Sequence, residues 1–185
     1  MALLAIAVLA FAIIHLVPAV PPAKARLQQA LGQAYGPAFG IAATLALVLI
    51  VVGWHASGYV AVYEPPPRAR QATVGIMLLA FLCLGVFLCR GRMRQQMRFP
   101  LAIAVMLWGI AHLFANGDLA SLILFGGLFC YAAVHLVLGL AYGVRPSPEV
   151  RAGHDILSLV AGVALYIAMV QLHPVLIGVP VLSLP

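Results

Sequence analysis

The sequence predicts an all-α protein, a polytopic transmembrane helix bundle of about six spans. The chain of 185 residues is 65% hydrophobic and only 8% charged, whereas soluble domains are about 45–50% apolar and about 25% charged. Its apolar residues form continuous runs, each near the roughly 20 residues that a helix needs to cross the hydrocarbon core. Proline and glycine collect in the gaps, where helices end. A single transmembrane domain over residues 1–185 is therefore expected.

Six apolar runs mark the expected spans. They cover residues 2–20, 39–57, 73–89, 99–115, 119–142 and 155–179. Although Ala23-Lys24-Ala25 mimics a cleavage site, the first run is long for a signal peptide and no basic residue precedes it, so we expect it to be a span of the mature protein. In the next gap, Lys24 and Arg26 alternate with apolar residues such as Leu27. This pattern favours a short interfacial helix, with a solvated loop as the alternative.

Basic residues are distributed unequally between the two sides of this predicted domain. Six spans place the first, third and fifth gaps on one side of the membrane. That side carries Lys24, Arg26, Arg90, Arg92, Arg94, Arg98, Arg145 and Arg151. The other side carries Arg68 and Arg70. By the positive-inside rule the first side is cytoplasmic, so we expect a multi-pass protein of a bacterial inner membrane with both termini outside. The expected partner is the lipid bilayer and not nucleic acid, because the basic residues follow the spans and form no binding groove.

Acidic residues and cysteines offer little chemistry. The four acids are Glu64, Asp118, Glu149 and Asp155. No paired carboxylates, nucleophile motif or phosphate-binding loop accompany them, which excludes a hydrolase of the usual kinds. Asp118 is expected to cap the fifth span, after a tight turn at Asn116-Gly117. The three cysteines are expected to be buried apolar fillers, because a free thiol packs as a small hydrophobe. They are Cys83, Cys89 and Cys130.

The histidines are the main candidates for function. Those that lie in or beside apolar runs are His15, His55, His112, His135 and His173. A titratable group inside a membrane span is costly and indicates function, although a neutral imidazole hydrogen-bonded to a neighbouring helix is the plainer interpretation of any single one. Helix rise places His15 and His135 in the half near the basic side, with His154 at its boundary, and the other three in the opposite half.

Neutral imidazole is an axial ligand of haem iron, and the cores of helix bundles commonly hold such cofactors. Trp108 precedes His112 by one helical turn and can pack against a porphyrin on the same face. A zinc site is less apt, because such sites usually combine histidine with cysteine or carboxylate at short spacing. A proton relay remains an alternative.

Several segments resemble one family of bacterial membrane proteins. The segment "LWGIAHLFANGDLASLILFGG" is similar to the signature of the NnrU family, and "HLVPAVPPAKARLQQALGQAYGPAFG", "GYVAVYEPPP" and "HPVLIGVP" follow family landmarks in order along nearly the whole chain. The resemblance implies a role in denitrification, linked to the expression or activity of nitrite and nitric oxide reductases. It also implies a distant similarity to 15-cis-zeta-carotene isomerase, a membrane enzyme that uses haem b.

The resemblance further implies haem iron ligands at two positions. The histidine ligands of the isomerase match His15 and His112 of this chain. Family members typically read Arg-His-Pro before the fourth span, but Phe99 stands in the histidine position here, so that residue can bind no metal. Helix rise predicts that His15 and His112 differ in depth by roughly 10–15 Å. The alternative by depth pairs His112 with His55 or His173, and His15 with His135.

Two functions follow as expectations. The first is an accessory membrane protein of denitrification that binds haem b through its histidines and interacts with components of the nitrite or nitric oxide reductase systems. The second is a haem-dependent isomerase or redox enzyme that acts on a lipid-like substrate such as a carotenoid. A transporter is less favoured, because the sequence contains neither an inverted repeat nor acidic residues within its spans.

Overall fold

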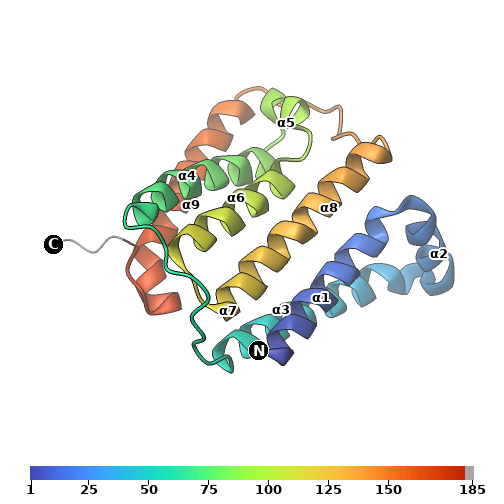
Figure 1. The fold of residues 1–185 in the computed structure, drawn as a ribbon. Helices are drawn as coiled ribbons and strands as arrows, with labels where there is room; N and C mark the ends of the chain where they lie inside the picture. Colours follow the sequence, from blue (N-terminus) through green and yellow to red (C-terminus); the bar gives the residue numbers. More distant parts are fainter. Residues whose placement is uncertain (182–185) are drawn as a thin grey trace.

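The computed structural model describes residues 1–181, and all regular structure in that part of the chain is helical (Figure 1). The helices are α1 (Ala2–Leu16), α2 (Pro21–Leu31), α3 (Tyr35–His55), α4 (Ala69–Leu88), α5 (Arg92–Met97), α6 (Pro100–Ala115), α7 (Leu119–Ser121), α8 (Gly127–Ala141) and α9 (His154–Ile177). A π-helical turn, Leu122–Gly126, joins α7 to α8 without a break. The all-α prediction is confirmed.

Five helical segments are long and apolar enough to cross a membrane. They are Ala2–Ala19, Pro21–His55, Ala69–Leu88, Leu119–Ala141 and His154–Ile177. The fourth predicted run, 99–115, forms α6, whose 16 residues extend about 24 Å at 1.5 Å per residue. That is shorter than a hydrocarbon core of about 30 Å. The multi-pass character is therefore confirmed with five full-length candidate spans, and α6 is an apolar helix packed between two of them.

The long helices pack in a row in the order α9, α4, α6, α8, α1, α3 (Figure 1). Successive long helices alternate in direction along the chain, whereas α8 and α1, which are neighbours in the row, run parallel (Figure 1). The N-terminus, the segments 56–68 and 116–118 and the end of α9 lie at one end of the helices, called the terminal end below (Figure 1). Helices α2 and α5 and the segment 142–153 lie at the other, called the basic end (Figure 1). This is the alternation that six runs predict, and it gathers eight of the ten basic residues at one end.

Small residues allow the helices to approach closely. A Cβ atom on Gly162 of α9 would lie 2.8 Å from the carbonyl oxygen of Phe81 on α4, and one on Gly85 would overlap the carbonyl oxygen of Ser158. Between α3 and α1, a Cβ on Gly53 would lie 2.8 Å from the Cα atom of Leu4. Backbone contact of this kind is how helices associate in lipid, where apolar burial alone supplies little driving force.

The segment 56–68 docks on the turn between α6 and α7. The backbone N–H groups of Val62 and Tyr63 donate to the carbonyl oxygen of Gly117 at 2.8 and 3.0 Å, and Leu119 donates to Val60 at 2.8 Å. The predicted tight turn at Asn116-Gly117 is wrong, since this backbone is extended and Ala61 and Asp118 form a β-bridge. The glycine is needed because a Cβ would overlap the carbonyl oxygen of Tyr63.

Two side chains complete this junction. The hydroxyl group of Tyr63 donates to the carbonyl oxygens of Leu113 and Asn116, the latter at 2.8 Å, at the end of α6. Burial, and secondly the charge of Asp118, raises the pKa of Tyr63 above its ordinary value. The predicted cap is confirmed, because Asp118 accepts from the backbone N–H of Ser121 at 3.0 Å and from its hydroxyl at 2.6 Å. These bonds satisfy backbone groups at two helix ends.

At the basic end, α5 is tied to the start of α9. The N–H of Met93 donates to the carboxylate of Asp155 at 2.9 Å, and Arg90 forms an ion pair with Glu149 at 2.8 Å. His154 accepts from the backbone N–H of Arg90 at 3.2 Å, which is a structural role. The helix predicted in the first gap is present as α2, and none of its residues is buried in the protein.

The cysteine prediction is correct for two residues and wrong for the third. Cys83 and Cys89 are buried, but Cys130 is exposed. Cys130 lies on a face of α8 that the two neighbouring helices of the row leave uncovered. The prediction failed here because apolar character alone does not distinguish a residue that contacts lipid from one that contacts protein.

Candidate functional site

The largest cavity that we describe lies at the basic end, between α1, α6 and α8, and has a volume of about 710 Å³. We call it the basic-end cavity. Two of the predicted site residues, His15 and His135, line it. Small-molecule sites in proteins range over about 300–1,000 Å³, so this cavity is large enough for a cofactor.

His15 lies in the last turn of α1 and is held in a defined tautomer. Its Nδ1 atom is 2.8 Å from the carbonyl oxygen of Phe11, one turn earlier. A carbonyl only accepts, so Nδ1 carries the proton and Nε2 keeps its lone pair. The ring also stacks on that of Phe11 at 4.0 Å and meets the ring of Tyr131 edge-on at 5.8 Å. His15 is therefore an oriented donor of one nitrogen lone pair.

His135 comes from α8, one turn after Tyr131. The two rings are 6.0 Å apart, and both residues line the cavity with His15. Helix spacing explains the placement, because positions four apart project from one face. The structure thus brings His15 and His135 together, as the alternative based on depth predicts.

Five aromatic rings contribute to the remaining wall, together with aliphatic side chains. The rings are those of Phe11, Phe87, Phe99, Trp108 and Tyr131. Phe99 packs against α8, where a Cβ on Gly139 would lie 2.5 Å from its ring. A flat apolar ligand fits such walls because aromatic rings offer large contact area at defined orientations.

Arginines surround the mouth of the cavity. Arg94, Arg98 and Arg145 line it. The guanidinium group of Arg98 lies 5.3 Å from the ring centre of Phe99, and that of Arg94 lies 5.1 Å from the ring centre of Phe87. The Nε–H of Arg98 also donates to the carbonyl oxygen of Val144 at 2.7 Å. The cavity is therefore apolar within and cationic at its opening.

The backbone at this mouth is strained. Arg98 is the one non-glycine residue with positive φ in the described part of the chain, with φ 64° and ψ −46°. The N–H of Phe99 donates to the carbonyl oxygen of Met97 at 2.7 Å. The bond and the angles together define a γ-turn of the rare, strained form. Such strain costs on the order of 1–3 kcal/mol and gathers at ligand sites.

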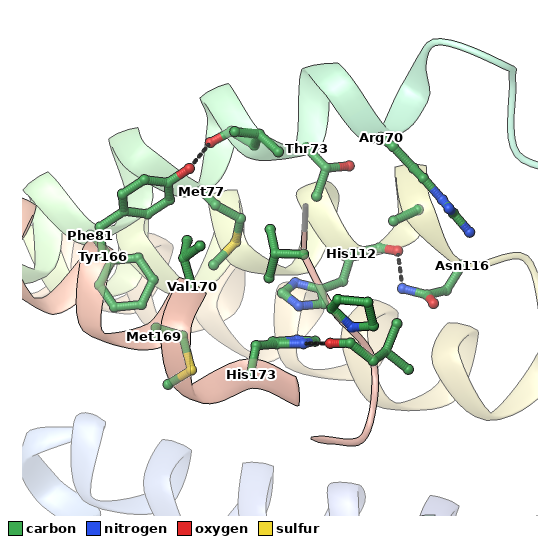
Figure 2. Close-up of a pocket in the computed structure, with 15 residues that line it drawn as sticks. Arg70, Thr73, Met77, Phe81, His112, Asn116, Tyr166, Met169, Val170 and His173 are labelled. Carbon is green, nitrogen blue, oxygen red and sulfur yellow. Dashed lines mark hydrogen bonds between the residues drawn. The ribbon is translucent and has the colours of Figure 1, made fainter. Parts of the chain in front are cut away.

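A second cavity, of about 150 Å³, lies at the terminal end between α4, α6 and α9 (Figure 2). We call it the terminal-end cavity. His112 and His173 line it, and both rings point into it (Figure 2). The Nδ1 of His112 is 2.9 Å from the carbonyl oxygen of Trp108, and its ring stacks on Phe125 at 4.4 Å. The Nδ1 of His173 lies 2.5 Å from the carbonyl oxygen of Val179. Each histidine thus directs its Nε2 lone pair away from its own backbone partner.

His15 and His112 are not brought together. The ring of His112 stacks on Phe125, whereas that of His15 lies beside Tyr131. Phe125 and Tyr131 are six positions apart along one continuous helical segment, which is about 9 Å of rise. A single iron holds each nitrogen at only about 2 Å. In this structure the two histidines therefore belong to different cavities.

The other histidines are accounted for. His55 is exposed at the last turn of α3 and lines none of the cavities described here. Among residues 1–181, no group of three or more histidine, cysteine or acidic side chains is arranged to hold a metal ion. The donor set at each cavity is a pair of imidazoles, which suits an iron whose other ligands come from a macrocycle.

One stripe of α6 connects the two cavities. Leu101, Val105 and Trp108 line both the basic-end cavity and a smaller one of about 140 Å³, and the smaller one shares Met77 and Phe81 with the terminal-end cavity. His112 continues the stripe one turn beyond Trp108. The spacing of three and four residues keeps all these side chains on one helix face. An apolar path therefore follows α6 from one pair of histidines to the other.

Sequence reasoning identified Trp108 but missed the arginines and most of the other aromatic rings of the site. In the sequence, the three arginines served only to assign the cytoplasmic side of the membrane: Arg94, Arg98 and Arg145. One available signal was the spacing of Tyr131 and His135, four residues apart on an apolar run. Another was the place of Arg98 immediately before a predicted span, since a basic residue there can face the ligand as well as the lipid headgroups.

Comparison with known proteins places the chain in one family. No curated protein and no solved structure matches the sequence. A family model described as NnrU protein matches residues 3–181, nearly the whole chain. With this coverage the protein belongs to the NnrU family.

Proposed function

We propose that this protein is a haem b-binding membrane protein that serves as an accessory factor in denitrification. One observation carries the haem assignment: His15 and His135 line one large cavity with aromatic walls. The family suggests the link with the expression or activity of nitrite and nitric oxide reductases, whose components are the proposed partners.

The residues of the basic-end cavity fit the chemistry of haem b. Haem presents a flat apolar macrocycle, an iron that accepts two axial nitrogens and two propionate groups. The cavity offers aromatic walls, two imidazoles and an arginine-lined mouth. The terminal-end cavity, at about 150 Å³, lies below the range of about 300–1,000 Å³ typical of small-molecule sites. The larger cavity is therefore the proposed haem site, with His15 and His135 as iron ligands.

A haem held by two histidines supplies one-electron transfer. The protein itself orients the histidine ligands and sets the basicity of their Nε2 atoms. The hydrogen bond from Nδ1 of His15 to Phe11 fixes the ring and raises the basicity of Nε2. The apolar side chains around it lower the local dielectric constant.

The proposed orientation in the bacterial inner membrane places the basic end in the cytoplasm. Eight of ten Lys and Arg residues lie at that end, which the positive-inside rule assigns to the cytoplasm. The haem site then lies near the cytoplasmic face and both termini lie outside. Reporter fusions test this: a C-terminal alkaline phosphatase should be active and a C-terminal green fluorescent protein dark. The reverse pattern contradicts it.

The haem assignment is tested on the purified full-length protein. Expression with a haem precursor should give a preparation with a Soret band that sharpens and shifts on reduction with dithionite. A preparation that stays colourless under these conditions overturns the assignment. The denitrification role is tested separately by gene deletion in a denitrifying host. Unchanged nitrite and nitric oxide reductase levels and activities contradict that role.

A second candidate is a haem-dependent enzyme that acts on a long apolar molecule. The apolar path along α6, with Trp108 midway between the two pairs of histidines, favours it. A substrate such as a carotenoid could lie along this path with its middle near the haem site. Incubation of the haem-loaded protein with carotenoid isomers, followed by chromatography, tests it, and an unchanged isomer ratio in both redox states rejects it.

A further inference from the structure

We infer that Arg98 and Arg145 bind the propionate carboxylates of the haem and thereby set its orientation in the basic-end cavity. The inference rests on the proposed function and names the residues that recognise the anionic part of the ligand. Both arginines line the same cavity as His15 and His135. They do so from the connecting segments at the basic end, since Arg98 lies between α5 and α6 and Arg145 follows α8. An amphiphile that enters with its macrocycle first leaves its carboxylates at the mouth of this cavity.

The arginines at the mouth have no acidic partner in the described part of the chain. The one ion pair among residues 1–181 joins Arg90 to Glu149. Asp155 is committed to the backbone N–H of Met93. Glu64 and Asp118, the remaining acids, lie in the segments of the terminal end. Three cations around one opening, without a carboxylate within 4 Å, create a positive potential that favours an anionic ligand.

Arg98 is held in position for such a ligand. Its Nε–H donates to the carbonyl oxygen of Val144, so the four N–H bonds of the two terminal nitrogens stay available for a carboxylate. Its guanidinium plane also lies over the ring of Phe99. A guanidinium group held at Nε loses little freedom when it binds a carboxylate in bidentate fashion.

The strained backbone at Arg98 is a second, independent observation. Glycine or asparagine is the usual residue at positive φ, yet an arginine occupies this γ-turn with φ 64°. A glycine at this position would remove the strain. It would not disturb a helix, because α5 ends at Met97 and α6 begins at Pro100. Ligand binding by the Arg98 side chain explains why an arginine, and not a glycine, occupies this strained position.

Phe99 and Arg98 have complementary places at the cavity. The ring of Phe99 packs at Gly139. Phe99 therefore adds apolar wall beside the mouth, and the adjacent Arg98 supplies the charge. Neighbouring residues thus serve the apolar and the anionic parts of one amphiphilic ligand.

The test compares haem b with its dimethyl ester, in which both carboxylates are esterified. The full-length protein is prepared without haem in detergent and titrated with each compound, and dissociation constants come from the Soret absorbance. Wild-type protein should bind haem b at least about 10-fold more tightly than the diester. Arg98→Gly should raise the haem dissociation constant about 10-fold and leave that of the diester within about 2-fold. Arg145→Gln should act in the same direction.

Arg92→Gln is the matched control, because Arg92 lies on α5 at the same end but is not among the lining residues of the cavity. It should leave both dissociation constants unchanged. Arg98→Gly keeps the fold because glycine adopts positive φ without strain, and an unchanged melting temperature checks this. If wild-type protein binds haem and diester equally, or if Arg98→Gly weakens both alike, the inference is overturned while the haem assignment stands. If neither compound gives a Soret band, both fail.

Discussion

His15 and Phe11 are joined twice, by a hydrogen bond of 2.8 Å from Nδ1 of His15 to the carbonyl oxygen of Phe11 and by stacking of the two rings at 4.0 Å. The two residues are one helical turn apart on α1. The hydrogen bond assigns the proton to Nδ1, and the stacking fixes the plane of the ring. His112 repeats the hydrogen bond with Trp108 on α6. His15 and His112 are therefore both oriented as Nε2 donors, and they face different cavities.

The first prediction concerns the ligands of the basic-end cavity. His15→Ala and His135→Ala should each abolish the spectrum of a haem with two histidine ligands, because each removes one axial nitrogen. Optical and electron paramagnetic resonance spectra of purified variants measure this, with a high-spin signal expected where haem is retained. His55→Ala is the control, since His55 is exposed on α3. Loss of the wild-type signal in that control contradicts the assignment of the cavity.

The second prediction separates the two ways of pairing the histidines. His112→Ala should retain the wild-type Soret position, because His112 lines the terminal-end cavity and not the basic-end one. The same spectra provide the measurement. If the signal of the low-spin haem disappears in His112→Ala but persists in His135→Ala, the pair is His15 and His112 as the family resemblance implies. The helix row would then have to rearrange when haem binds.

The third prediction concerns the crossing of α4 and α9. Gly162→Val should detach α9 and lower the melting temperature in detergent, because even a Cβ at this position lies only 2.8 Å from a backbone oxygen of α4. Overpacking of this kind typically costs about 1–3 kcal/mol. Gly40→Ala is the control in α3, where nothing lies within 4 Å of the added Cβ, and it should be neutral or stabilising. Equal melting temperatures for both variants are inconsistent with the packing described.

The fourth prediction uses the pKa of Tyr63. Tyr63→Phe should destabilise the protein by about 1–2 kcal/mol at neutral pH, because the hydroxyl bonds to the end of α6 are lost. The fold raises the pKa of this phenol above 10.0, so the unfolded chain ionises first as pH rises. The stability that Tyr63 contributes is therefore complete below about pH 10 and is lost as pH rises through the higher folded value. Melting temperatures from pH 8 to pH 11 should fall less steeply for Tyr63→Phe than for the wild type. A parallel fall contradicts the assignment.

Much of this architecture could be read from local patterns. The lengths of the apolar runs gave the helices to within a few residues, and the gaps gave the two ends. Asp118 was identifiable as a helix cap because capping depends only on its neighbours in sequence. The depth of each histidine followed in the same way from helix rise and the direction of each run. These properties depend on residues close together along the chain.

Which helices lie side by side could not be predicted from the sequence in this way. Depth alone leaves His55 and His173 as equal partners for His112, but α9 packs on α4 and lines the terminal-end cavity with α6, while α3 lies at the far end of the row. The exposure of Cys130 and the extended backbone at Gly117 also depend on which segment lies alongside. In lipid, apolar side chains facing protein resemble those facing the acyl chains, so hydropathy does not encode the order of helices. Composition and run length established the membrane helices and their ends, whereas close backbone packing at residues such as Gly162 and Gly53 established which histidines share a cavity.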